Sequence, residues 1–207
     1  MKKKLIIDIL LFILMLLEFS RNYIVSILHE IIGISLLILV IIHLILNKNY
    51  LINIFKTKYN LKKIIILVIN ILFMISFIIT MLFGILSSID LLPFLNLDNF
   101  NIIHLHKVFG YISLLMMGLH LGINFNVIFG KLVSKIKNKY LLYGLSILII
   151  ILGIYSFIKV DFWYHLIGRY GFSIVTDNIF INTLEYLSVG MTFAIITNLI
   201  YRKGMKK

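Results

Sequence analysis

Long apolar runs separated by short polar segments are the dominant pattern of this chain. Several of these runs reach the roughly 20 residues that a helix needs to cross about 30 Å of hydrocarbon. The pattern predicts six membrane spans, near residues 5–22, 24–46, 64–88, 103–127, 140–159 and 181–201. The first run follows Lys2–Lys4 as in a signal peptide, but no small-residue cleavage site comes after it, so we interpret it as a span.

Composition agrees with a membrane protein. Of the 207 residues, 61% are hydrophobic, and the mean hydropathy is +1.08, more apolar than a soluble domain needs. Six spans with short loops leave no room for a sizeable soluble domain. We therefore expect an all-α fold in which residues 1–207 form a single six-helix transmembrane bundle.

The formal charge of +12 is sorted by position along the chain. All basic residues except Arg21, Lys107, Lys159 and Arg169 lie at the N-terminus, in the loops after the second and fourth spans, or in the C-terminal tail. The acids other than Asp8 fall at or near the opposite ends of the spans: Glu18, Glu30, Asp90, Asp98, Asp161, Asp177 and Glu185. By the positive-inside rule, this distribution predicts a multi-pass protein of the cell membrane with both termini in the cytoplasm. The charge indicates topology, and no nucleic-acid partner is expected.

The chain contains no cysteine. This excludes disulfides, cysteine-ligated iron–sulfur clusters, a thiolate nucleophile and the covalent attachment of a c-type haem. Any redox cofactor must be held by other ligands.

Two spans share a histidine motif. His29–Asn47 and His106–Asn124 both follow H-x3-G-x9-H-L-x2-N, which places His29, Gly33 and His43 against His106, Gly110 and His120. The two histidines of each copy are 14 residues apart, so they project from one helix face within about 40° and lie about 21 Å apart along the axis. We call these four the repeat histidines.

The two spans that carry the motif run in the same direction, because one span returns the chain between them. His29 and His106 should therefore share an outer level, and His43 and His120 an inner level. Two such pairs can supply the axial ligands of two non-covalent b-type haems, one at each level. Gly33 and Gly110, one turn inside the outer histidines, would let a flat macrocycle approach the backbone.

Other interpretations of the repeat histidines remain open. A single intramembrane histidine often only hydrogen-bonds to a neighbouring helix. Ionisable residues inside a membrane also mark proton or metal-ion pathways. A metal-ion path would normally have carboxylates or thiols beside the histidines, and the motif spans offer none at mid-membrane. The matched spacing favours haem, with a metal-ion or proton transporter as an alternative.

The double motif resembles the transmembrane di-haem cytochromes b, including quinol-oxidising respiratory cytochromes and ferric reductases. The segments HEIIG…HLILN and IHLHKVFGYISLLMMGLHLGIN look most like the flavinylation-associated cytochrome family, over about residues 5–127. That resemblance implies electron transfer from the membrane quinol pool to an extracytosolic flavoprotein or another acceptor. A haem-bearing membrane-anchor subunit of a respiratory oxidoreductase is a further alternative.

Some polar residues near the outer ends of the spans have two interpretations. Arg21, Lys107 and Arg169 either snorkel to the interface or pair with the propionates of the outer haem, for which Arg21 and Arg169 are the candidates. Glu30 and Glu185 are either interface carboxylates or acceptors of quinol protons.

His104 is expected at the outer mouth of the bundle, with a swap for His106 as ligand or a proton-handling role as alternatives. His165 is expected in an interfacial aromatic belt with Trp163, Tyr164 and Tyr170. Asp8 is expected to be an ordinary packing or interface residue, and Gly84, Gly118 and Gly122 are expected to allow close approach of helices.

Overall fold

The computed structural model describes residues 2–54, 56, 58–97, 99–125, 130–169 and 178–203. Within these ranges the chain is helical, without strands. The elements are α1 (Lys2–Glu18), η1 (Arg21–Tyr23), α2 (Ser26–Leu46), α3 (Lys48–Ile54), α4 (Leu61–Leu86), η2 (Pro93–Leu95), α5 (Phe100–Ile123), α7 (Gly130–Lys135), α8 (Lys139–Lys159), α9 (Phe162–Leu166) and α10 (Ile179–Lys203). The all-α prediction is confirmed.

Five helices in the described part of the chain are long and apolar enough to cross a membrane: α2, α4, α5, α8 and α10. Each coincides with a predicted span to within a few residues. The first predicted span corresponds to α1, which has 17 residues and is therefore about 26 Å long. This length falls short of the roughly 30 Å of a bilayer core.

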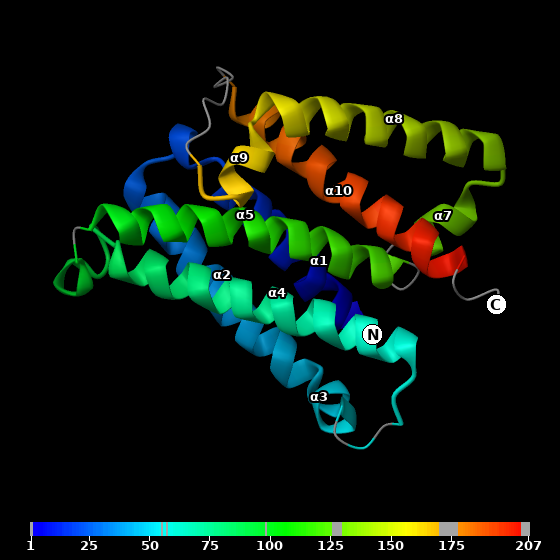
Figure 1. Ribbon diagram of the computed structural model, residues 1–207, viewed down its shortest axis with the longest axis horizontal. Coiled ribbons are helices and arrows are strands. Elements are labelled where there is room, and N and C mark those ends of the chain that lie inside the picture. The colour runs from blue at the N-terminus through cyan, green and yellow to red at the C-terminus, as the bar shows by residue number, and fades with distance from the viewer. Residues whose placement is uncertain are drawn as a thin grey trace.

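The long helices alternate in direction, so α2 and α5 run parallel (Figure 1). The start of α1, the end of α10, α3 and α7 lie at one end of the bundle, and the end of α1, the end of α4 and the short helix α9 lie at the other (Figure 1). The lysine-rich segments therefore gather at one end, as the charge pattern predicted.

Local sequence explains where several helices begin. Asn60, Asn99 and Asn138 precede α4, α5 and α8, and the side chain of each accepts a hydrogen bond from a backbone N–H in the first turn. Apolar side chains stay exposed at helical spacing on the outer face of α4, at Ile64, Val68, Ile71, Ile75, Ile78 and Leu82. This stripe is a surface suited to lipid.

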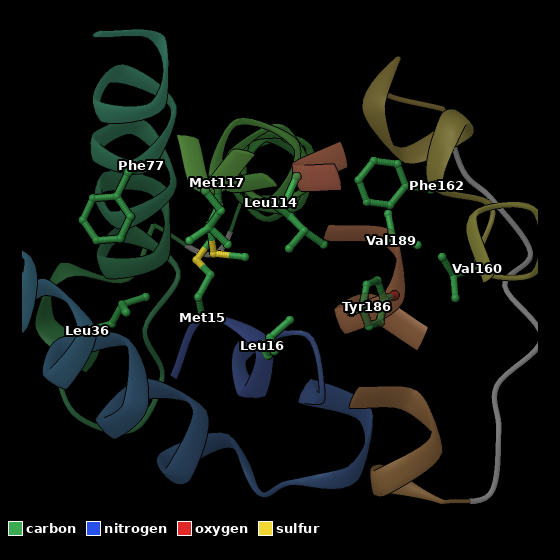
Figure 2. Packing of buried hydrophobic residues seen from close by; sticks show 12 residues of the cluster. Met15, Leu16, Leu36, Phe77, Leu114, Met117, Val160, Phe162, Tyr186 and Val189 are labelled. Atoms are coloured by element: carbon green, nitrogen blue, oxygen red, sulfur yellow. The ribbon is translucent and has the colours of Figure 1, made fainter. Parts of the chain in front are cut away.

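The core is formed where α1 and α10 pack against the other long helices. Met15 and Leu16 of α1 lie in the middle of the buried cluster, among side chains of α2, α4, α5 and α10 (Figure 2). A Cβ added at Gly118 or Gly122 of α5 would lie 2.8 or 2.6 Å from a backbone oxygen of α10. The expected close helix approach is confirmed at both glycines, and at Gly84 of α4 the neighbour is the His106 ring.

Some sequence predictions fall outside the described residues. These are the end of the fourth span at residues 126–127, the acids Asp98 and Asp177, the belt residue Tyr170, and the tail lysines Lys206 and Lys207.

Candidate functional site

A cavity of about 900 Å³ occupies the outer half of the bundle, with walls from α1, α2, α4 and α5. His29 and His106 face it from the two motif helices, and Gly33 and Gly110 line it one turn further in. The volume lies within the range of cavities that bind cofactor-sized ligands. The site therefore has the residues and the space that the sequence assigned to its outer level.

The two outer imidazoles have ring centroids 6.1 Å apart, with their planes 86° from parallel. A metal–imidazole bond is about 2.0 Å long and a ring nitrogen lies about 1 Å from the centroid, so two imidazoles that share one metal ion have centroids roughly 6 Å apart. The separation of His29 and His106 thus fits a bis-imidazole pair, before any ligand is considered.

The two motif glycines border open space. A Cβ at Gly33 would meet Glu18 Oε1 at 3.7 Å, and one at Gly110 would meet Thr80 Cγ2 at 4.0 Å, both ordinary contacts. Neither glycine is needed for close helix packing, unlike Gly118 and Gly122. Their effect is to leave the cavity wall flat, which suits a planar macrocycle.

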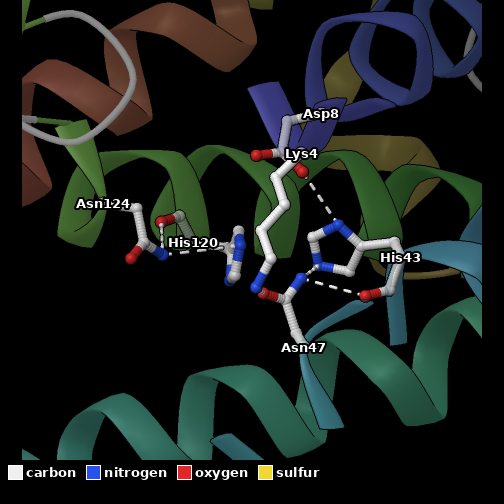
Figure 3. Close-up of polar contacts among 6 residues, drawn as sticks. All are labelled: Lys4, Asp8, His43, Asn47, His120 and Asn124. Carbon is white, nitrogen blue, oxygen red and sulfur yellow. Dashed lines mark hydrogen bonds and ion pairs between the residues drawn. The ribbon is translucent and has the colours of Figure 1, made fainter. Parts of the chain in front are cut away.

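The inner level contains the second half of the motif. Figure 3 shows His43 and His120 approaching one another from α2 and α5, with the side chain of Lys4 lying between them in that view. Lys4 Nζ donates a 3.0 Å hydrogen bond to Asn47 Oδ1. The structure therefore brings the repeat histidines together level by level.

Each repeat histidine has an oxygen atom beside Nδ1. His43 Nδ1 donates to Asp8 Oδ1 at 2.8 Å (Figure 3). Glu18 Oε2 lies 2.9 Å from His29 Nδ1, but the two atoms make no hydrogen bond. In α5, His106 Nδ1 donates to the Thr80 carbonyl at 2.9 Å and His120 Nδ1 to Asn70 Oδ1 at 2.8 Å.

These partners select one tautomer. A carboxylate and a carbonyl oxygen only accept hydrogen bonds, so in His43, His106 and His120 the proton belongs on Nδ1 and the lone pair on Nε2. At the inner level a second contact agrees, because the side-chain amides of Asn47 and Asn124 donate to Nε2 of His43 and His120 at 3.3 and 3.4 Å. Metal-binding histidines characteristically hold the other ring N–H on a carboxylate or carbonyl in this way.

The partners also show that the repeat extends beyond one helix. In each hairpin the motif helix carries the histidines and the preceding helix supplies their acceptors: α1 for α2, and α4 for α5. The acceptors Asp8 and Glu18 are ten residues apart, and so are Asn70 and Thr80. The duplicated unit is therefore a helical hairpin.

Asp8 was predicted to be an ordinary packing or interface residue, and this was wrong, because it bonds His43. The sequence offered a signal, since an ionisable residue in an apolar span needs a partner. Asp8 and Glu18 also place carboxylates beside two of the repeat histidines, where a metal-ion path was expected to have them and the motif spans offered none. Nevertheless, no group of three or more His, Cys, Asp or Glu that could hold a bare metal ion occurs among the residues described.

The basic candidates at the outer end have different positions. Arg21 and Lys107 line the outer cavity, and Arg21 Nη1 donates to the Ile24 carbonyl at 3.3 Å. Arg169 is exposed and is not among the described lining residues. Arg21 and Lys107 are thus the cations placed to meet acidic groups of a ligand in this cavity.

His165 is not part of an aromatic belt, contrary to prediction. Its ring stacks on Tyr111, with centroids 4.3 Å apart and planes 17° from parallel, and it lines the outer cavity. The reason is the short helix α9, which follows Asp161 at a left-handed φ of 49° and turns His165 inward with buried Phe162. Burial lowers the pKa of His165; the Asp161 carboxylate opposes this shift, and the nearby Lys107 and His104 lower the pKa further.

The remaining predicted belt residues Trp163 and Tyr164 are exposed, at 57% and 47%, as a belt requires. His104 stacks in parallel on Phe100 at a centroid distance of 6.3 Å, outside the described lining of the cavity.

The main contacts of the Glu30 side chain are with the loop after α4. Its carboxylate accepts hydrogen bonds from Ser88 Oγ and from the backbone N–H groups of Ile89, Asp90 and Leu91, at 2.7 to 3.2 Å. It therefore fixes the loop after α4.

Glu185 is buried, and it accepts a 2.5 Å hydrogen bond from Lys159 Nζ. Its carboxylate joins α10 to α8, and neither Glu185 nor Lys159 lines the outer cavity as described.

Comparison of the chain with protein-family models, curated proteins and solved structures finds no match.

Proposed function

We propose that this protein is a six-span, cytochrome b-like membrane protein that transfers electrons through two b-type haems. His29 and His106 hold the outer haem, and His43 and His120 hold the inner one. The resemblance of residues 5–127 to flavinylation-associated cytochromes supports a place in the cell membrane and an acceptor outside the cytoplasm.

One observation carries the proposal: each of the repeat histidines has an oxygen atom 2.8 to 2.9 Å from Nδ1, and His43, His106 and His120 donate a hydrogen bond to it. Four histidines that served only as hydrogen-bonding contacts between helices would have no reason to share one ring orientation. In this orientation Nε2 would bind the iron, and at the inner level that bond would replace the hydrogen bonds from Asn47 and Asn124. The 6.1 Å separation of the outer rings supports the same conclusion.

A haem held between two imidazoles would supply one-electron transfer. The chain supplies the rest. Its repeat histidines hold the two levels about 21 Å apart along each motif helix, and the apolar bundle excludes water. Gly33 and Gly110 keep the outer wall flat, and Arg21 and Lys107 face the cavity where carboxylates of a ligand need counterions.

The donor we propose is a membrane quinol, and the acceptor a flavin on a separate protein. Oxidation of one quinol to quinone releases two electrons and two protons, and reduction of one flavin takes up two electrons and two protons. Electrons cross the protein singly, while protons leave and enter at the two reaction sites.

An absorption spectrum of the purified protein, oxidised and then reduced with dithionite, tests the proposal. We expect a shift of the Soret band on reduction and a pyridine haemochrome of the b type, with two haems per chain. A protein without either signal would be a transporter or another non-haem protein, and the proposal would be wrong.

Histidine variants test the pairing. His43→Ala and His120→Ala should each lose about one of the two haems, because each removes one ligand of the inner pair. His104→Ala is the matched control and should keep both haems. Retention of two haems in both inner variants would contradict the pairing. Copurification of a catalytic partner would favour the anchor-subunit alternative.

A further inference from the structure

The acceptors of the two hairpins differ in charge. Both histidines of α2 have a carboxylate of α1 at Nδ1, Glu18 for His29 and Asp8 for His43. Both histidines of α5 have a neutral oxygen of α4 instead, from the Thr80 backbone or the Asn70 amide. Each level of the site therefore pairs one histidine backed by a carboxylate with one backed by a neutral group.

Such carboxylates change the electronic character of the ligand they contact. A carboxylate that accepts the Nδ1 proton in a hydrogen bond raises the basicity of Nε2. A more basic ligand with a negative charge nearby stabilises ferric iron relative to ferrous iron. It therefore lowers the reduction potential of the haem. The side chains of Glu18 and His29 are 14% and 19% exposed, and those of Asp8 and His43 are both 29% exposed, so water screens these contacts only in part.

We propose that α1 is a redox-tuning helix. Asp8 is a positioning residue that orients the His43 imidazole through a hydrogen bond. The negative charges of Asp8 and of Glu18, which lies 2.9 Å from His29 Nδ1, each lower the reduction potential of the haem at that level. This inference rests on the proposed function and goes beyond it, because it assigns separate control of each level to a single carboxylate.

The test uses substitutions of nearly equal size that move the charge without removing the oxygen acceptor. Asp8→Asn keeps an acceptor for His43 and removes the charge, and Asn70→Asp adds a charge at His120 on the other side of the same level. The double variant Asp8→Asn/Asn70→Asp moves the carboxylate from one ligand to the other.

Potentiometric titration of the purified haem protein gives the readout. We expect Asp8→Asn to shift the ferric-to-ferrous equilibrium of the inner haem about tenfold toward ferrous, a rise of about 59 mV for one electron. Asn70→Asp should lower the inner potential by a similar amount, and the double variant should lie near wild type. Glu18→Gln should raise the outer potential and leave the inner one unchanged.

The outcomes separate the two proposals. If the wild-type protein binds no haem, the proposed function fails. If it binds two haems but neither Asp8→Asn nor Asn70→Asp moves the inner potential, the tuning inference is wrong while the electron-transfer function stands. If Asp8→Asn loses the inner haem, Asn70→Asp decides: a lowered potential supports tuning, and an unchanged one overturns it.

Discussion

The loop after α4 should loosen when Glu30 is changed to glutamine. In the native protein Oε1 accepts from the N–H groups of Ile89 and Asp90, and Oε2 accepts from Ser88 Oγ and the Leu91 N–H. A glutamine replaces one oxygen by an NH2 group, which cannot accept. With the NH2 group in place of Oε1, the hydrogen bonds from Ile89 and Asp90 are both lost. With it in place of Oε2, the Leu91 hydrogen bond is lost, while the Ser88 hydroxyl can accept from the NH2 group instead of donating.

The free-energy cost of the substitution follows from the number of hydrogen bonds that are lost. A hydrogen bond to a charged group contributes roughly 1.5–3 kcal/mol when buried. The loop residues 89–91 are exposed, so water replaces part of each lost bond, and we expect about 1 kcal/mol for each. One or two lost hydrogen bonds, about 1–2 kcal/mol in total, correspond to roughly 5- to 30-fold faster local opening.

Amide hydrogen exchange of residues 89–91 measures this opening. The same substitution at a distant carboxylate, Glu185→Gln, is the control and should leave exchange in this loop unchanged. Unaltered protection of Ile89 and Leu91 in Glu30→Gln would show that the carboxylate does not hold the loop. A slower reduction by quinol with unaltered loop exchange would instead support the proton-accepting role.

Two further predictions concern the packing of α10. Gly122→Ala should destabilise the protein by about 1–3 kcal/mol, because its Cβ would lie 2.6 Å from the Ala194 carbonyl oxygen; thermal unfolding in detergent measures this. The control Gly144→Ala, in open space on α8, should stabilise by up to about 1 kcal/mol, and equal effects at both glycines would contradict the packing argument. Lys159→Met should lower the free energy of unfolding by about 3 kcal/mol, because it leaves buried Glu185 without its cation. The double variant Lys159→Met/Glu185→Leu should regain most of that stability. A double variant no more stable than Lys159→Met would show that the unpaired charge is not the cause.

The sequence predicted the elements that depend on apolar runs and charge. Spans of about 20 apolar residues predict helices with little ambiguity, and the spacing of the repeat histidines predicted which side chains share a level. The short helices α3, α7 and α9 were not predicted, because five to seven residues carry too little periodicity. The inward turn of His165 was missed for the same reason.

The partners of the histidines were harder to predict. Asp8 and Glu18 are visible as charges in an apolar segment, but their partners depend on how α1 rotates against α2. The Thr80 acceptor is a backbone carbonyl, which no side-chain motif reports. Asp8 and Glu18 are ten residues apart, and so are Asn70 and Thr80. This shared spacing can be recognised only after the structure has shown which residues contact the histidines. The duplication of the whole hairpin could therefore not be predicted from the sequence alone.

The duplicated hairpin has a consequence for assembly. Each hairpin, α1–α2 or α4–α5, carries one histidine of the outer level and one of the inner level, so neither hairpin alone contains a complete site. Direct contact between α2 and α4 is sparse, and the outer cavity lies between the two hairpins. A group bound at either level therefore bridges two modules, and its binding free energy contributes to closure of the bundle. If the proposed haems bind there, their insertion and the final docking of the hairpins are a single thermodynamic event.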